Sequence, residues 1–476
     1  MSDQYIFWDL ETTGRNDKFN QITQVGAVLT NQNFEVKDKL EIHSKLREGK
    51  WFEPGALITT GVDPINLYKN NYPNYYEASA QLYETFQQWS SSSTIFIGFN
   101  NINFDEPFLR QALYQNLMPE IYMTVTNNNC RMDVYDILRY VNVYDPEKIK
   151  INKNEKGKES LKLEDISKAN NLSTNYEAGP HDAVYDSLIT LELNKILSIR
   201  CPQIWNAAYE FRHRDTPKKF MVDNLVFTNT NFFKKQKIDA QTSIAGIPGE
   251  KHKYLLFNLL HDPKKFHNLD DKDLIKKVDK KNSERICEVF DGSKSKVLLN
   301  ESFCFKDNRF IEIGVDELRN RANFIKKNEE FCTRLIKLYL EANKVDWPEP
   351  YNLEDRIFES FPSHQDKKLM LDFHTSPNNK KYEICKQFKD DRYKEIAVRI
   401  LYEIAPQTLP ELEKNNYELE IKERFNDNDK VKWNSKNRIL ASLESDIDKM
   451  ITDESEKIEF KQRVITFLNT ESAKWD

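Results

Sequence analysis

The sequence predicts an α/β protein of several domains, and three observations support this fold class. Apolar runs with the character of strands alternate with helical periodicity over residues 1–200. Short β-like runs follow between residues 220 and 305, and the pattern after residue 351 is helical and rich in Lys and Glu. A chain of 476 residues is also too long for one ordinary core. We therefore expect three domains, at residues 1–200, 201–350 and 351–476.

Composition excludes several classes of protein. The formal net charge is -6, so any binding of nucleic acid must come from local basic patches. The six cysteines are scattered without a zinc-ligand spacing, which is typical of reduced thiols in a cytoplasmic protein. The N-terminus has no signal-peptide pattern, and no apolar run approaches the ~18 residues of a membrane span, so we expect no membrane association.

The elements of the predicted first domain follow from periodicity and turn residues. A buried strand begins at Tyr5 and stops at a Thr-Thr-Gly turn. A later helix begins near Pro107, since proline is tolerated in a first helical turn. In chain order we expect a hairpin of strands at 21–30 and 34–42, helices at 54–62 and 75–89, a strand at 95–99, a strand-to-helix junction at 131–139, a short helix at 161–172 and a long helix after 181. Further on, we expect residues 318–343 to be helical.

Two acidic residues of the first strand indicate a metal site. Asp9 and Glu11 are two residues apart, so their side chains lie on one face of the strand. Two carboxylates inside an apolar strand repel each other and resist burial, and a divalent cation between them relieves both effects. Hard oxygen ligands suit magnesium or manganese. The alternative is an exposed edge strand with two solvated acids, and the apolar flank from Tyr5 to Trp8 argues against it.

Three further residues have simple interpretations when each is taken alone. Asp105 lies at a strand-to-helix junction, where Asp is a common N-cap. Asp186 falls on the long helix and by itself would be a solvated helix face. His181 precedes that helix and by itself would be an N-cap or a surface residue.

Taken together, these residues resemble the DEDD exonuclease superfamily in its His-containing (DEDDh) branch. The shared pattern is Asp-x-Glu on a strand, Asn-x-Asn-Phe-Asp after a strand, and His-x-Ala-x-x-Asp at a helix. The resemblance implies that Asp9, Glu11, Asp105 and Asp186 are the metal-binding acids. It also implies that His181 is the general base, which makes these five residues the catalytic set.

The resemblance extends to the bacterial exodeoxyribonuclease I family through residues 54–62, 104–110, 131–139 and 160–170, and it is clearest up to about residue 200. This family implies a ribonuclease H-like exonuclease domain with a mixed sheet, then an SH3-like β-rich domain and an all-helical C-terminal domain. The family usually has Arg where Lys162 stands here. An ammonium group can make a point-charge contact to phosphate but cannot make the bidentate contact of a guanidinium.

The family also implies an activity. It is 3′-to-5′ degradation of single-stranded DNA to 5′-mononucleotides by two-metal-ion hydrolysis, in DNA repair and recombination. Two Mg²⁺ ions per active site are expected, with Mn²⁺ as the alternative. Glu11, Arg110, Arg139 and Lys162 are the expected contacts to DNA.

The family further implies a protein partner, the acidic C-terminal tail of single-stranded-DNA-binding protein, which docks on a basic ridge. The candidate ridge residues are Lys251, Lys253, Arg319, Arg321 and Arg334. We expect a monomer.

Other classes remain open on the sequence. One alternative is another DEDDh exonuclease that proofreads or trims RNA, although such enzymes are usually much shorter. A second is a catalytically inactive nucleic-acid-binding module, and a third is a structural interaction protein. Retention of all five catalytic residue types argues against the second, and carboxylates on a buried strand argue against the third.

Overall fold

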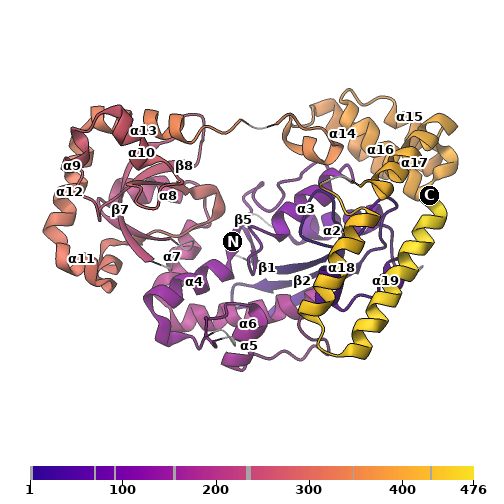
Figure 1. The fold of residues 1–476 in the computed structure, drawn as a ribbon, viewed down its shortest axis with the longest axis horizontal. Coiled ribbons are helices and arrows are strands. Elements are labelled where there is room, and N and C mark those ends of the chain that lie inside the picture. The colour runs from indigo at the N-terminus through magenta and orange to yellow at the C-terminus, as the bar shows by residue number, and fades with distance from the viewer. Residues whose placement is uncertain are drawn as a thin grey trace. The chain divides into compact units, whose positions relative to one another are not determined.

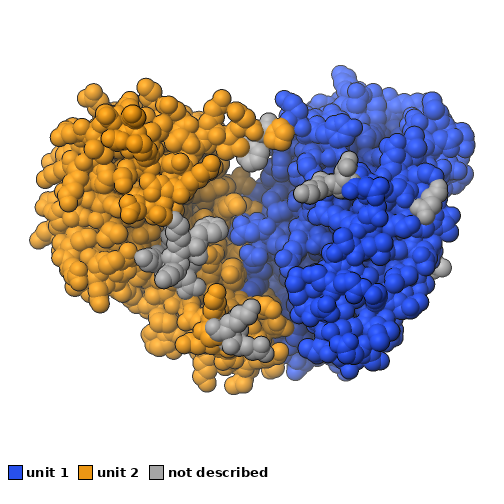
Figure 2. Space-filling view, viewed as in Figure 1, with its two compact units in different colours: residues 1–129, 174–189, 349–476 blue, residues 130–173, 190–348 orange. Residues whose placement is uncertain are grey.

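The computed structural model describes residues 4–68, 71–90, 93–153, 157–231, 237–346, 348–428 and 431–475. It contains two compact units, shown in blue and orange in Figure 2. The first unit comprises residues 1–129, 174–189 and 349–476, and the second comprises residues 130–173 and 190–348. The α/β class, the mixed sheet and the helical C-terminal region are confirmed. The three-domain division at residues 200 and 350 stays a prediction.

A mixed sheet forms the centre of the first unit. The strands of this sheet that belong to the first unit are β1 (Gln4–Thr12), β2 (Ile22–Asn31), β3 (Val36–His43) and β4 (Thr94–Gly98), and they lie in the order β3-β2-β1-β4. β1 pairs antiparallel with β2 and parallel with β4. Residues 5–8 of β1 are buried, as their apolar sequence predicts. The predicted hairpin is confirmed, because β2 and β3 pair antiparallel.

Helices cover this sheet and extend the first unit. Phe86 of α2 and Leu109 of α3 pack in one apolar core with Trp8 of β1. Asn74 caps α2 by accepting a hydrogen bond from the backbone N–H of Glu77, which satisfies a donor that the helix start leaves open. The helices are α1 (Pro54–Thr60), α2 (Tyr75–Trp89), α3 (Asp105–Tyr114), the start of α6 (Ala183–Arg200), α14 (His364–Thr375), α15 (Asn378–Cys385), α16 (Asp391–Ile404), α17 (Glu411–Asn426), α18 (Lys436–Met450) and α19 (Glu454–Trp475).

The C-terminal helices share a core with the N-terminal part of the chain. In Figure 1, α18 and α19 are yellow and lie beside the indigo and purple sheet region. α18 contacts α1, and α19 contacts the short 3₁₀ helix η1 (Pro64–Tyr68). Trp51 and Phe52 are buried with Phe467 and Trp475 in this core. The two ends of the chain therefore build one unit.

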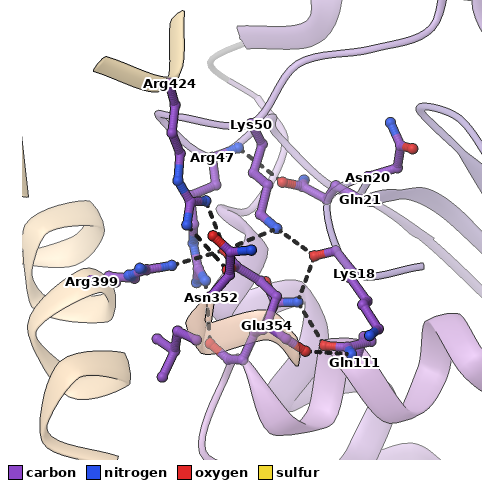
Figure 3. Close-up of polar contacts among 12 residues, drawn as sticks. Lys18, Asn20, Gln21, Arg47, Lys50, Gln111, Asn352, Glu354, Arg399 and Arg424 are labelled. Carbon is purple, nitrogen blue, oxygen red and sulfur yellow. Dashed lines mark hydrogen bonds and ion pairs between the residues drawn. The ribbon is translucent and has the colours of Figure 1, made fainter. Parts of the chain in front are cut away.

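A buried charge network joins the same two parts of the chain (Figure 3). Glu354 is 0% exposed and accepts hydrogen bonds from Arg399 at 2.9 Å and Arg424 at 2.8 and 3.1 Å. Lys50 Nζ lies 3.9 Å from Glu354 and donates to the Lys18 carbonyl at 3.0 Å. Burial would raise the pKa of Glu354, but Arg424, Arg399 and Lys50 outweigh it and hold the pKa well below its usual range.

The second unit contains an antiparallel sheet in the order β10-β6-β7-β8-β9. Its strands are β6 (Phe227–Asn231), β7 (Lys237–Gly246), β8 (Lys253–Asn258), β9 (Cys287–Asp291) and β10 (Leu299–Asn300). This is the β-rich part that the short runs predict. The other elements are β5 (Cys130–Asp133), α4 (Val134–Tyr144), α5 (Leu163–Asn170), the rest of α6, α7 (Pro202–Phe211), α8 (Thr216–Asp223), α9 (Lys264–His267), α10 (Asp271–Val278), α11 (Asn308–Ile313), α12 (Val315–Lys327) and α13 (Glu329–Ala342).

The helical structure expected at residues 318–343 is confirmed, and it is divided between two helices, α12 and α13. Asn328 between them has φ -112° and ψ 72°, outside the helical region. Glu329 and Glu330 then occupy the first turn of α13, where negative charge is favourable. Among the described helices, none is long and apolar enough to cross a membrane.

Candidate active site

The end of β1 positions the first two acids. Asp9 lies opposite Gly26 and Glu11 opposite Gln24 in the antiparallel register with β2. Both acids are partly exposed, whereas Trp8 and Leu10 beside them are buried, which is the alternation of a strand. The strand ends at Thr12, where the register shifts. Asp9 and Glu11 therefore face the same side at the end of the strand.

Asp105 reaches this strand end from α3. Its Oδ1 accepts a hydrogen bond from the backbone N–H of Leu10 at 3.0 Å, and Leu10 stands between the two acids of β1. The donor is open because the pairing of β1 with β4 ends at Phe7. The N-cap interpretation is wrong, since Phe104 is the N-cap position and Asp105 is the first helical residue. Burial raises the pKa of Asp105 to about 7, although hydrogen bonds to its carboxylate act in the opposite direction.

His181 and Asp186 enter from the start of α6. The backbone N–H of His181 donates to Asp186 Oδ2 at 3.2 Å. Ligand atoms of Glu11, His181 and Asp186 all lie within 4.8 Å of one another. The first turn of α6 can contact β2 because the strand has a glycine, Gly26, at the point of contact. A Cβ on Gly26 would lie 2.0 Å from the carbonyl carbon of Ala183 in α6.

The electrostatics connect all four acids. Burial raises the pKa of Asp9 well above its ordinary value, and the charges of Asp105, Glu11 and Asp186 raise it further. Burial likewise raises the pKa of Glu11 to about 9, again with Asp186 and Asp105 contributing. Mutually repelling carboxylates in a buried site are the donor set that a divalent cation neutralises, so these residues fit a hard metal ion.

A cavity of about 380 Å³ opens beside this cluster, a volume in the range of small-molecule sites. It lies within the first unit. His43 and Tyr72 stack on one of its walls with ring centroids 4.8 Å apart. The lining residues are Glu11, Thr23, Gln24, His43, Ser44, Thr60, Gly61, Val62, Asp63, Asn66, Leu67, Tyr72, Gly179, Pro180, His181 and Asp182.

The residues expected to contact DNA are divided between the two units. Arg110 lies on α3 of the first unit, where its guanidinium pairs with Glu106 at 3.0 Å. Arg139 and Lys162 belong to the second unit, where they pair with Asp136 at 3.1 Å and Glu164 at 3.5 Å. Their contact with a substrate held at the acids stays a prediction.

Sequence reasoning missed two polar residues of the cavity, Gln24 and Asp182. Asp182 accepts hydrogen bonds from the backbone N–H groups of Val184 and Tyr185, so it caps α6. An Asp directly before a helical pattern is a known start signal and could have identified it. Gln24 gave no such signal, because a polar residue on a strand is ordinary.

Known proteins share both the sequence pattern and the fold. A family model described as "Exonuclease" matches residues 6–194, and one described as "Exonuclease I C-terminal domain" matches residues 351–470. Exodeoxyribonuclease I of Buchnera aphidicola subsp. Schizaphis graminum is 25% identical over 410 residues, covering 83% of this chain and 82% of its own.

Solved structures give the same result for the fold. Exonuclease I of E. coli in complex with a dA16 oligonucleotide has a TM-score of 0.82 and 18% identity, covering 98% of this chain and 99% of its own. A structure of SSB/exonuclease I with an inhibitor has a TM-score of 0.79 and 18% identity, covering 99% and 100% of the two chains. At this identity the likeness shows the fold alone.

Proposed function

The chain belongs to the exodeoxyribonuclease I family, and on this premise we propose that it degrades single-stranded DNA from the 3′ end to 5′-mononucleotides. One observation carries the proposal. Asp9 and Glu11 of β1, Asp105 of α3 and Asp186 of α6 converge with His181 on one strand end, although up to 177 positions separate them in sequence. A helical C-terminal region of the family's own type follows in the same chain.

The exonuclease domain implies dependence on a divalent metal. We propose two Mg²⁺ ions, with Mn²⁺ as a substitute, held by Asp9, Glu11, Asp105 and Asp186. Bound metal would supply a water of lowered pKa and charge stabilisation at the leaving oxygen. The raised pKa values of Asp9 and Glu11 support this assignment, because they show that these acids need a positive partner to stay ionised at neutral pH.

His181 is the proposed general base, and it would accept the proton of the attacking water. An imidazole is the side chain that most often takes up a proton in catalysis at neutral pH. Its backbone N–H bond to Asp186 ties it to a proposed metal ligand. We expect His181→Ala to lower kcat roughly 10²–10⁴-fold with an intact fold. Rate profiles against pH would check the role, and a mutant with the wild-type profile would contradict it.

Arg110, Arg139 and Lys162 are the proposed contacts to the phosphates of the DNA strand, and Glu11 is the proposed contact at the terminal nucleotide. Cationic side chains that track the backbone are the general means of binding a single strand. Lys162 is 74% exposed, so its ammonium group is accessible to a ligand.

The acidic tail of single-stranded-DNA-binding protein is the proposed protein partner, and the solved SSB/exonuclease I structure supports the pairing. Of the candidate ridge residues, Arg321 donates to the carbonyls of Leu259 and Leu260, and Arg334 donates to the carbonyl of His267. Lys253 pairs with Glu250 and Arg319 pairs with Glu301, but both side chains are more exposed than those of Arg321 and Arg334. Lys251, which is also exposed, Lys253 and Arg319 are the first choices for charge-reversal tests of peptide binding. We also propose a cytoplasmic monomer that acts in DNA repair and recombination.

A substrate comparison tests the function. Single-stranded DNA, duplex DNA and RNA of one sequence, labelled at the 5′ end, are incubated with Mg²⁺, with Mn²⁺ and with EDTA. We expect rapid shortening of single-stranded DNA from the 3′ end, released as 5′-mononucleotides, and no reaction in EDTA. Preference for RNA or for a mismatched duplex would favour a trimming or proofreading exonuclease. Binding without cleavage in any metal would indicate an inactive module.

A further inference from the structure

The amide of Gln24 lies between β2 and the start of α6. Gln24 pairs with Glu11 in the sheet, and directly paired residues of neighbouring strands share one face. Its Oε1 accepts a hydrogen bond from the backbone N–H of Ala183 at 3.2 Å, and its Nε2 donates to Asp182 Oδ2 at 2.8 Å. Gln24 is 7% exposed, so its side chain is largely buried in the wall of the cavity.

The orientation of this amide follows from its partners. A backbone N–H can only donate, so the Gln24 carbonyl oxygen must face Ala183, and the amide nitrogen then faces the carboxylates of Asp182 at 2.8 Å and Glu41 at 3.4 Å. The other carboxylate oxygen of Asp182 accepts from Val184 at 3.1 Å and Tyr185 at 3.0 Å. A continuous chain of bonds thus links β2 through Asp182 to the first turn of α6.

His181 depends on this chain of bonds. It directly precedes Asp182 and has φ +66°, a left-handed conformation that a residue with a Cβ adopts only when its surroundings impose it. Its backbone N–H is held by Asp186 on the α6 side. Gln24 and Asp182 fix the neighbouring peptide on the β2 side, so the His181 backbone is held from both directions.

We propose that Gln24 is a positioning residue for hydrolysis, which holds His181 against the end of β1 by binding Asp182 and Ala183. The inference rests on the proposed function, because it gives His181 a task that demands a fixed place. Partners that orient a catalytic group typically change activity 10–100-fold when they are removed.

A polarity swap tests this proposal. In Gln24→Glu a carboxylate oxygen faces Asp182, so two acceptors meet without a proton between them. In Asp182→Asn the new amide meets the Gln24 amide, or it turns and meets the N–H groups of α6. The double variant Gln24→Glu/Asp182→Asn restores a donor opposite an acceptor at the bonds to Ala183, to residue 182 and to the first turn of α6, and its net charge equals that of the wild type. The longer bond from Gln24 to Glu41, at 3.4 Å, is lost in Gln24→Glu and in the double variant alike.

We expect each single variant to lose roughly 10–100-fold in kcat on single-stranded DNA with KM within about twofold, and the double variant to recover to within a few fold of wild type. Gln87→Glu, the same change on the exposed face of α2, is the matched control and should keep wild-type activity. A double variant no faster than the slower single variant would overturn the proposal.

Two further measurements separate positioning from other effects. In the His181→Ala background, Gln24→Glu should cause no additional loss of kcat, and a further 10-fold loss would overturn the proposal by showing action on another group.

Hydrogen–deuterium exchange of amides 181–186 should accelerate in Gln24→Glu and return to the wild-type rate in the double variant. Unchanged exchange in both variants would also overturn it. If wild-type protein degrades no nucleic acid, the proposed function fails, while exchange still decides whether Gln24 holds this segment.

Discussion

At the scale of single residues, the carboxylates at the end of β1 repel one another when they are ionised. Asp9, Glu11 and Asp105 are each disfavoured as anions by burial and also by the charge of neighbouring carboxylates. Protons and metal ions therefore compete for the same oxygen atoms. The arrangement favours protonated acids when metal is absent and ionised acids when it is bound.

This competition predicts a dependence of stability on pH. Without metal, the raised pKa lets folded Glu11 keep its proton up to about pH 9, whereas in the unfolded chain it ionises near its ordinary pKa of 4.5. The native state then binds more protons than the unfolded state across this window, so stability falls as pH rises. We expect the free energy of unfolding in EDTA to fall between about pH 5 and pH 9, by up to about 1.4 kcal/mol per pH unit from Glu11 alone.

Chemical denaturation at a series of pH values measures this effect. Glu11→Gln removes one titrating group, so its slope against pH should be shallower than that of wild type. Saturating Mg²⁺ should stabilise the wild type more at high pH than at low pH, since the ionised acids bind the ion. Equal slopes for the two proteins in EDTA would contradict the prediction.

The five proposed catalytic residues could be predicted from sequence because their residue types and order form a pattern. The bond between Leu10 and Asp105 could not, since 95 positions separate its two groups and no local periodicity records it. The same limit hid Gln24, which meets Asp182 across 158 positions. The residues next to Asp105 in sequence favoured a helix N-cap, whereas in the structure its carboxylate binds the backbone N–H of Leu10 on β1.

At the scale of elements, the approach of α6 to β2 determines where the histidine and the last acid lie. Gly26 is the contact point, and its missing side chain lets the first turn of α6 rest on the strand. Ser187 of α6 reinforces the contact by donating to the Gly26 carbonyl at 3.1 Å. This packing is part of the active site although neither residue is charged.

We predict that Gly26→Ala displaces α6. The new Cβ would meet backbone atoms of Ala183, which cannot rotate away. Overpacking of this kind costs typically about 1–3 kcal/mol, and kcat should fall because His181 and Asp186 move with the helix. Thermal unfolding and nuclease assays check both effects. Gly246→Ala on β7, where the nearest atom lies 3.9 Å away, is the matched control, and equal behaviour of the two variants would refute the argument.

Element types in the first unit were predictable because their periodicities are strong. The predicted helix at 75–89 matches α2 in both bounds, and the strands of the predicted hairpin differ from β2 and β3 by one or two residues. The break at Asn328 was not predictable, because apolar spacing continues across it. α12 ends because Asn328 has non-helical backbone angles, and no proline or glycine in the segment signals this break.

At the scale of the whole molecule, the Glu354 network predicts that stability depends on one carboxylate. Glu354→Gln would remove the fully buried counter-charge of Arg399, Arg424 and Lys50. The two arginines would keep the more exposed carboxylate of Glu420, and Arg399 would also keep Glu395. Removing one partner of a buried ion pair costs typically about 3–5 kcal/mol. We expect a loss of this size in denaturant unfolding. Glu383→Gln, which breaks the exposed pair with Lys386, should change stability by less than about 1 kcal/mol, and an equally small loss at Glu354 would count against the network.

The sequence predicted a separate helical domain after residue 351 but not its partners. Composition shows that α14 to α19 are helices, and it does not show which surface they cover. Trp51, Phe52 and Leu57 are apolar residues that any core could bury, and the structure buries them with α17, α18 and α19. The contact between these segments depends on the shape and charge of surfaces that lie hundreds of positions apart in the sequence.

The shared unit has a consequence for synthesis of the protein. Residues 1–129 leave the ribosome long before residues 349–476, and at ~5–20 residues per second the interval is on the order of tens of seconds. During that time Lys50 has no Glu354, and Trp51 has no Phe425 to pack against. A nascent chain therefore cannot complete the unit that carries Asp9 and Glu11. Active nuclease therefore forms in the cell only after the full-length chain has been released from the ribosome.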